Sequence, residues 1–154
     1  MSGPDLAALA GLPAIRGAVA SPDGDRVAFY RDGPDETALC VLDVATGERT
    51  TRVEDAVPDS PETHLAWTPD GESVLYHYGP DPGRGDDVYA AAPDGTVRRV
   101  VARDGRCLLT DVNERRRRLL VLDWSGGGDL YRHDLDAGET ALVPVEGSVL
   151  GAKL

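Results

Sequence analysis

Residues 21–30 read SPDGDRVAFY, and residues 68–78 read TPDGESVLYHY. Both stretches place a Pro-Asp-Gly turn directly before a run of apolar and aromatic residues. Gly adopts positive φ without steric cost and Pro pre-sets the turn, so each stretch predicts a tight hairpin between two strands. A third run, NERRRRLLVLD at residues 113–123, keeps the apolar strand but carries four arginines, 115–118, where the turn is expected.

Around these turns the chain repeats with a period of about 45 residues, and each repeat contains four short apolar runs separated by turns. Four short strands at this period are typical of β-propeller blades. We therefore predict an all-β fold, a partial β-propeller over residues 1–154 with about three four-stranded blades. The blades are expected at about 14–55, 62–103 and 106–146, and residues 147–154 are expected to form the first strand of a further blade.

The predicted strands are apolar on both alternating faces, as in LLVL at residues 119–122. A strand that is buried on both sides loses the strict alternation of apolar and polar residues, so this pattern favours sheets packed between neighbouring sheets. Residues 5–9, which follow Pro4, are expected to form a short helical turn before the first blade.

The net charge of −11 and the pI near 4.6 disfavour nucleic-acid binding, because a phosphate backbone requires a basic surface. Lys153 is the only lysine, and Asp outnumbers Glu by 19 to 8. An Asp-rich, Lys-poor surface stays hydrated where salt screens its self-repulsion, which favours a halophilic protein. The alternative is the codon bias of a GC-rich genome, which also enriches Arg, Ala, Gly and Asp.

Residues 1–12 have no basic segment before an apolar one, and no apolar run approaches the ~18 residues that a membrane span needs. We therefore expect a cytoplasmic protein that does not enter membranes. The two cysteines, Cys40 and Cys107, fall in different repeats, two blades apart, so we expect free, buried thiols rather than a disulfide.

The motifs SPDGDRVAFY and TPDGESVLYHY resemble the propeller repeats shared by TolB-type proteins and the prolyl oligopeptidase family of serine peptidases. The opening segment, DLAALAGLPAIRGAVASPDGDRVAFYRDG at residues 5–33, is similar to the start of the N-terminal propeller in acylaminoacyl-peptidase-like members, particularly acidic ones of haloarchaeal type. In that family the catalytic Ser, Asp and His lie on an α/β-hydrolase domain that follows the propeller. These 154 residues do not contain such a domain.

The resemblance implies a non-catalytic N-terminal propeller segment, so we do not expect the chain to be an enzyme. Its partners would be further blades or the α/β-hydrolase domain, and the resemblance makes peptide ligands conceivable. The alternatives are a stand-alone TolB-like interaction module and a truncated gene product without retained function. Because complete propellers have roughly four to eight blades, we expect exposed apolar faces on the first and third blades and self-association of the isolated chain.

The sequence predicts no catalytic, cofactor-binding or metal-binding residues. Ser125 in WSGGG lacks the Gly two positions earlier that a G-x-S-x-G nucleophile elbow requires, and it precedes a strand. The glycines at 126–128 open no helix and precede no Lys, so they do not form a phosphate loop. No cofactor is expected.

Three single histidines, His64, His77 and His133, show no metal-ligand spacing. A fold that brings His77, Asp86 and Asp87 together would form a metal cluster, but we expect these residues to be polar side chains at the surface and at strand edges. The arginines at 115–118 are expected in a solvated turn paired with acidic neighbours rather than in a nucleic-acid site. The strand aromatics are expected to pack between blades: Trp67, Trp124, Tyr76, Tyr78, Tyr89 and Tyr131.

Overall fold

The computed structural model describes residues 13–33, 37–58, 64–79, 86–103, 105–113, 115, 117–124 and 128–147. Within these ranges every regular element is a β-strand. The expected helical turn at 5–9 lies outside the described residues, as do residues 148–154 of the expected extra strand. The strands are β1 (Ala14–Ala20), β2 (Arg26–Asp32), β3 (Thr37–Asp43), β4 (Arg49–Glu54), β5 (Leu65–Trp67), β6 (Val74–Tyr78), β7 (Asp87–Ala91), β8 (Val97–Val101), β9 (Cys107–Asn113), β10 (Arg118–Asp123), β11 (Asp129–Asp134) and β12 (Thr140–Val143).

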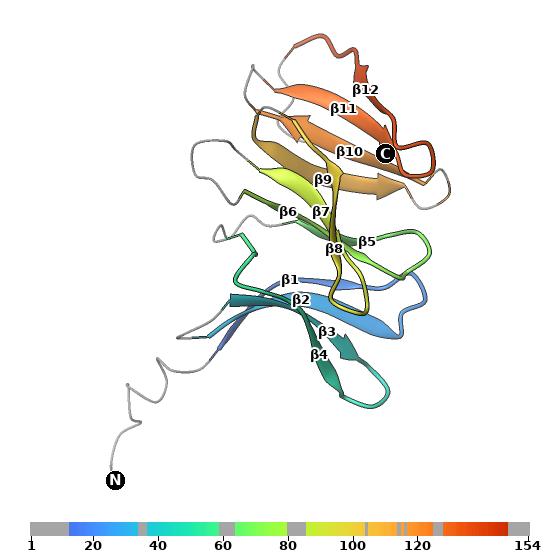
Figure 1. Cartoon of the computed structure of the whole chain (residues 1–154). Helices are drawn as coiled ribbons and strands as arrows, with labels where there is room; N and C mark the ends of the chain where they lie inside the picture. Colours follow the sequence, from blue (N-terminus) through green and yellow to red (C-terminus); the bar gives the residue numbers. More distant parts are fainter. Residues whose placement is uncertain are drawn as a thin grey trace.

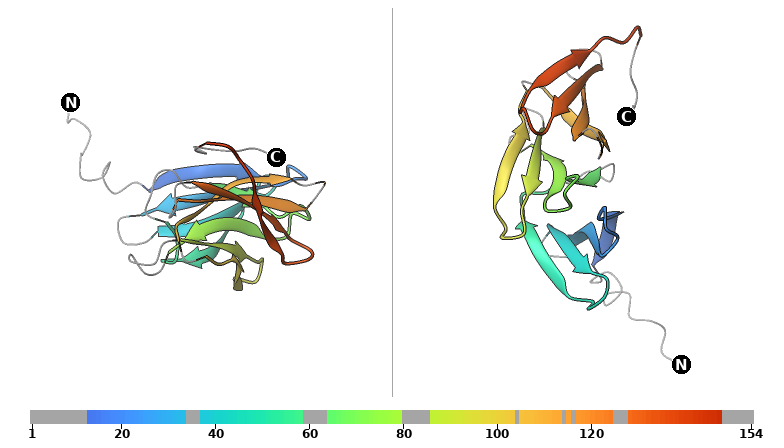
Figure 2. Two further views of the ribbon diagram at one scale, coloured as in Figure 1. Left: turned by 90° about the horizontal axis from the view of Figure 1, so that it is seen from above. Right: turned by 90° about the vertical axis from the view of Figure 1, so that its right-hand side faces the viewer.

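The strands form three separate four-stranded sheets, each an antiparallel meander in chain order. We call the sheets β1–β4, β5–β8 and β9–β12 blade 1, blade 2 and blade 3. The blades stack side by side along a curved arc, with blade 1 at one end and blade 3 at the other (Figures 1 and 2). Their first strands, β1, β5 and β9, lie next to one another on the same side of this arc. The predicted all-β fold of three four-stranded blades is confirmed.

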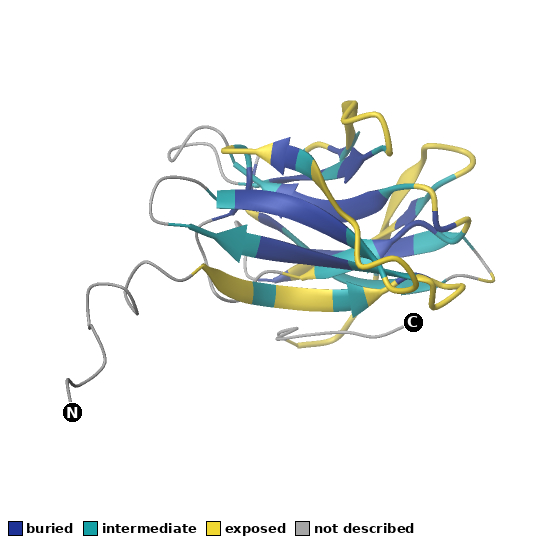
Figure 3. Ribbon diagram, turned by 90° about the horizontal axis from the view of Figure 1, so that it is seen from below, coloured by how far each residue is buried: buried dark blue, intermediate teal, exposed yellow. Residues whose placement is uncertain are grey.

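The core lies between blades rather than within them. Between blades 1 and 2, one face of β2 and β3 packs on the facing strands β5, β6 and β7, with Tyr30, Trp67 and Tyr76 as the largest buried side chains. Between blades 2 and 3, Leu75 and Val88 pack on Leu109 and other residues of β9 and β10. Buried segments therefore lie in the middle of the sheets, and the turns are exposed (Figure 3).

The Ser/Thr-Pro-Asp-Gly motif has a physical basis in its hydrogen bonds. In blade 2, Thr68 Oγ1 donates to Asp70 Oδ1 at 2.6 Å and accepts from the Ser73 backbone N–H at 3.0 Å. The same Asp70 oxygen accepts from the Glu72 N–H. Ser21 and Asp23 make the corresponding bonds in blade 1.

The predicted turn glycines adopt positive φ, including Gly24 at 79° and Gly71 at 70°. In blade 3 the turn has no glycine, and Arg117 takes the positive φ instead, at 48°. Its guanidinium donates to Asp136 at 2.8 Å and to Asp70 of blade 2 at 3.3 Å. The expected pairing of this arginine run with acidic neighbours is confirmed at Arg117, which also ties blade 3 to blade 2.

On each end blade, the face that points away from the other blades carries apolar side chains at the same strand positions as the faces packed between blades. Counting from the first hairpin, Ala28 and Tyr30 of blade 1 face blade 2, and Leu120 and Leu122 of blade 3 hold the same positions on its outward face. Val27 and Phe29 form the corresponding outward face of blade 1. The outward faces of the end blades are thus apolar in the positions that other blades use for stacking.

The prediction that these faces would be broadly exposed is wrong at their centres. Phe29 is 7% exposed, and Leu120 and Leu122 are 3% and 1% exposed. The exposed apolar side chains lie instead on first strands, turns and sheet edges, as at Ile15 (66%) and Leu142 (56%). The isolated chain therefore offers a smaller apolar surface than the repeat count suggested.

We expect Thr68→Ala to lower the free energy of unfolding by about 1–2 kcal/mol more than Thr68→Ser, because only Ala removes the hydroxyl of this buried side chain, which bonds Asp70 and the Ser73 N–H. Ser fills the equivalent position in blade 1, at Ser21, so Thr68→Ser is the matched control for loss of the methyl group. Urea denaturation of the two variants measures the difference. Equal losses would show that the turn hydroxyl contributes nothing.

Candidate binding site at the inner edge of the blades

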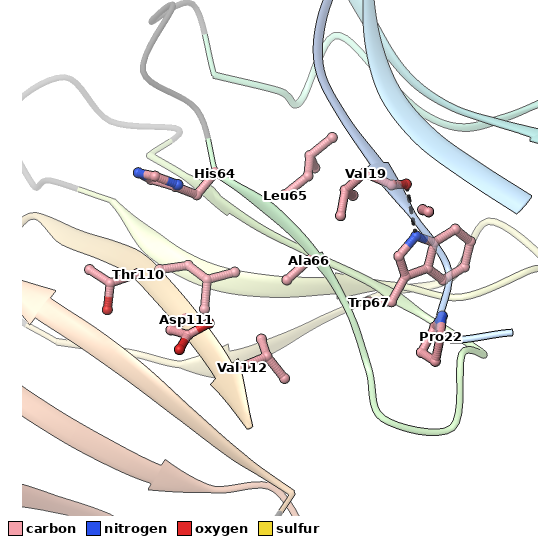
Figure 4. Close-up of a pocket in the computed structure, with 11 residues that line it drawn as sticks. Val19, Pro22, His64, Leu65, Ala66, Trp67, Thr110, Asp111 and Val112 are labelled. Carbon is pink, nitrogen blue, oxygen red and sulfur yellow. Dashed lines mark hydrogen bonds between the residues drawn. The ribbon is translucent and has the colours of Figure 1, made fainter. Parts of the chain in front are cut away.

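The first strand of each blade is an edge strand, because it pairs with only one neighbour in its sheet. These three strands meet at the inner side of the arc, where β5 contacts both β1 and β9. A hollow of about 200 Å³ opens between them (Figure 4). Its lining comprises Val19, Ala20, Pro22, His64, Leu65, Ala66, Trp67, Leu109, Thr110, Asp111 and Val112.

The hollow has an apolar floor and a few polar groups. Trp67 lines it and spans blades 1 and 2, because its indole N–H donates to the Val19 carbonyl at 3.2 Å. The Arg26 guanidinium lies 5.0 Å from the centre of the same indole, a cation–π contact. Thr110 donates its hydroxyl proton to the Leu120 carbonyl at 3.0 Å, and Asp111 follows it on β9. His64, which precedes β5, is exposed.

Charged side chains near the junction of blades 2 and 3 form ion pairs. Arg103 donates through Nε to Asp123 at 3.1 Å and stacks 3.7 Å from the centre of the Tyr131 ring. Asp87 accepts from Arg99 at 3.2 Å and from the Arg103 backbone N–H at 3.2 Å. These arginines occupy the oxygen atoms of Asp87 that a metal would need.

His77, Asp86 and Asp87 do not assemble as a metal site. Asp86 accepts from Arg106 at 3.4 Å. Among the described residues, no group of three or more His, Cys, Asp or Glu side chains is placed to hold a metal ion.

Two of the three histidines are buried, whereas the sequence predicted surface or strand-edge positions for all three. His64 is exposed, but His77 and His133 are 1% and 4% exposed. His133 Nδ1 lies 2.9 Å from Thr140 Oγ1, whereas His77 Nδ1 has no hydrogen-bond partner. Burial lowers the pKa of His77 to about 4, against a smaller opposing effect of Asp86, and burial also lowers the pKa of His133. His77 occupies the stacking position of Tyr30 and Leu122, which explains its burial.

Most of the predicted aromatic packing is present. Trp67 and Tyr76 lie in the core between blades 1 and 2, and Tyr89 lies 5.9 Å from Tyr76 and 6.3 Å from Tyr78 between ring centres. Trp124 departs from the prediction, because it lies in the turn after β10 and is 42% exposed.

The remaining sequence expectations concern the thiols and the loop after β10. Cys40 and Cys107 are free and buried, as predicted. Ser125 lies outside the described residues, so the prediction that it is not a nucleophile stays a prediction. No helix among the described residues is long and apolar enough to cross a membrane.

No family model matches the chain, and no curated protein matches it significantly. Solved structures do match. TolB from Acinetobacter baumannii aligns with a TM-score of 0.69 at 18% identity, over 88% of this chain and 33% of that chain. A structure from a study of two prolyl endopeptidases aligns with a TM-score of 0.68 at 22% identity, over 92% of this chain and 23% of that chain. The fold is that of a β-propeller segment.

This segment spans about a third of the length of TolB and about a quarter of the length of the prolyl endopeptidase. The β-propeller domain of the Trilobed protease from Pyrococcus furiosus gives a further measure of size. It aligns with a TM-score of 0.64 at 15% identity, over 86% of this chain and 43% of that chain, so that chain is about twice as long. The likeness establishes the fold, and at these identities it carries no information on activity.

The hollow was missed by sequence reasoning because its lining comes from three first strands that are far apart in the chain. Thr110 and Asp111 belong to a strand whose pattern reads simply as apolar with polar interruptions. No spacing rule connects them with Trp67 or Val19, since only the stacking of the blades brings these strands together.

We expect the chain to lose stability as the pH falls from about 6.5 to 4, because unfolded His77 binds a proton in this range and buried His77 does not. The loss from His77 should be about 3 kcal/mol, from the distance between the two pKa values. In His77→Leu, which copies Leu122 of blade 3, this part of the pH dependence should vanish. Urea titrations from pH 4 to 7.5 test this, and identical pH profiles for both proteins would contradict it.

Proposed function

We propose that the chain is the N-terminal, non-catalytic part of a larger β-propeller in a prolyl oligopeptidase-like serine peptidase of the acylaminoacyl type. The observation that carries this proposal is the stacking register. Leu120, Leu122 and Leu130 of blade 3 hold the register positions that blades 1 and 2 use to contact the next blade, although all three side chains are buried in this chain. The register, rather than an open apolar surface, is therefore the reason to propose that a further blade follows blade 3.

The extent of the structural matches supports the proposal that this chain is part of a larger peptidase. The prolyl endopeptidase and the puromycin hydrolase align with nearly all of this chain, yet the aligned part is 23% and 24% of their own lengths. In the proposal, the remaining length corresponds to further blades and the α/β-hydrolase domain. The chain would then form part of the wall around the propeller's central channel, with β1, β5 and β9 facing it.

A second candidate function is a TolB-like interaction module without a hydrolase partner. It is favoured by matches to TolB structures, two of which align with TM-scores of 0.69 and 0.67. The coding sequence after the Leu154 codon distinguishes the peptidase segment from the TolB-like module. Further Pro-Asp-Gly repeats followed by a G-x-S-x-G motif support the peptidase, and further repeats without that motif support the module.

We expect the purified chain to hydrolyse neither acyl-amino-acid p-nitroanilides nor p-nitrophenyl esters, because a serine hydrolase needs nucleophile, base and oxyanion donors in one place. The assay compares the wild-type chain with Ser125→Ala and, as a matched control, Ser73→Ala. Hydrolysis that Ser125→Ala abolishes and Ser73→Ala preserves would overturn the non-catalytic assignment. Equal background rates for all three proteins support it.

A further inference from the structure

We propose that two copies of this chain associate through β12, whose free edge pairs antiparallel with the β12 edge of a second copy about a two-fold axis. This inference concerns the outer edge of blade 3 and does not depend on whether further blades or a hydrolase domain accompany the chain. It rests on the free backbone edge of β12, on its lack of charge and of a bulge, and on the charges that flank it.

The fourth strand of each blade is an edge strand, because among the described residues it pairs only with the third strand of its sheet. The fourth strands β4, β8 and β12 run along the outer side of the arc, opposite the first strands (Figure 2). An edge strand presents backbone N–H and C=O groups that can template pairing with another chain. The three outer edges differ in how they are protected against such pairing.

The outer edges of blades 1 and 2 carry two protective features. β4 contains Arg49 and Arg52, and β8 contains Arg98 and Arg99. Both strands also pair with their neighbours through a register shift, as a β-bulge produces. Charged side chains and bulges are devices by which edge strands avoid pairing with other chains.

The outer edge of blade 3 has neither feature. β12 reads Thr-Ala-Leu-Val, without a charged side chain, and it pairs with β11 in unbroken register. The Leu142 side chain on this strand is 56% exposed. A regular, uncharged and exposed edge favours the addition of another strand.

The hydrogen-bonded ladder indicates which backbone groups of β12 are directed away from β11. The Asp134 N–H donates to the Glu139 carbonyl at 2.9 Å, so these two residues form a hydrogen-bonded pair. Hydrogen-bonded and non-hydrogen-bonded pairs alternate along an antiparallel ladder, so Ala141 bonds to β11. Its neighbours Thr140 and Leu142 therefore direct their N–H and C=O groups outward.

A two-fold axis at Ala141 makes these outward groups complementary to themselves. Thr140 of one copy then lies opposite Leu142 of the second copy, and each outward N–H group of these residues meets a carbonyl. The two Ala141 residues face each other as a non-hydrogen-bonded pair, in which Cα atoms are only about 4.5 Å apart. A small side chain suits this close spacing.

The charges nearest to this axis on β11 and β12 and in the turn between them are of opposite sign. Arg132, the β11 partner of Ala141, is exposed, and so is Glu139, which precedes β12. Both share a sheet face with Ala141, because cross-strand partners and residues two apart lie on one face. In the dimer, Arg132 of each copy attracts Glu139 of the other on that face. A self-paired β8 would instead bring arginines of like charge together.

Sedimentation equilibrium of the full chain tests the proposal. We expect a monomer–dimer equilibrium with a Kd of about 100 µM, measured over roughly 5–500 µM chain, because only a few backbone hydrogen bonds and one leucine of each copy contribute. In about 0.15 M NaCl the Debye length is about 8 Å, longer than the ~5 Å between opposite side chains, so charges introduced at position 141 act across the axis.

The decisive variant is Ala141→Arg, which copies Arg98 at the equivalent position of β8 and sets two arginines against each other. It should raise the Kd at least about tenfold, whereas Thr50→Arg, which adds the same charge at the equivalent exposed position of β4, should leave it within about twofold. Ala141→Glu should also weaken association. An equimolar mixture of the Ala141→Arg and Ala141→Glu chains should restore it, because opposite charges then face each other. Circular dichroism confirms that each variant folds.

Three results would overturn the proposal: a chain that stays monomeric throughout this concentration range, equal Kd values for Ala141→Arg and Thr50→Arg, or no restored association in the mixture. Dimers that Ala141→Arg leaves intact would place the contact elsewhere, as on the outward faces of the end blades. Failure of the peptidase assignment would appear instead in the coding sequence and in the hydrolysis assay, so the two outcomes are separable.

Discussion

Burial of each blade on a neighbouring blade is the constraint on which this structure depends. Blade 1 places Ala28, Tyr30, Leu39 and Val41 against blade 2, and blade 2 places Leu75 and Val88 against blade 3. A single four-stranded sheet has no second layer of its own, so its apolar faces need neighbours to form a core. The apolar outward faces of the end blades, the curvature of the arc and the meeting of the first strands all follow from this stacking.

Polar contacts reinforce the same stacking at the edges of the blades. Arg117 bridges Asp70 of blade 2 and Asp136 of blade 3, and Arg103 joins the linker after blade 2 to Asp123 and Tyr131. These pairs are partly exposed, so each contributes modestly to stability. Arginine can stack on an aromatic ring and donate to a carboxylate at once, which lysine does less well. An Arg-rich, Lys-poor chain is thus suited to these junctions.

The sequence predicted the blades because their signals are local: a Pro-Asp-Gly turn, strands apolar on both faces and a fixed period. It also predicted the free cysteines and the role of Trp67 in packing. It placed His77 at the surface because a histidine in a strand carries no sign of burial, whereas the register puts it at a stacking position. Arg117 at positive φ and the hollow around Asp111 depend on contacts between distant segments, which no local pattern encodes.

Native-state hydrogen exchange, resolved by strand, tests the dependence of each blade on its neighbours most directly. Blade 2 is covered on both faces, so the amides of β6 and β7 should exchange most slowly and only through global unfolding. The equivalent strands of the end blades, β2, β3, β10 and β11, should exchange faster, since each end blade has one internal neighbour. Slower exchange in blade 1 or blade 3 than in blade 2 would show that the blades are stable individually and would contradict the account.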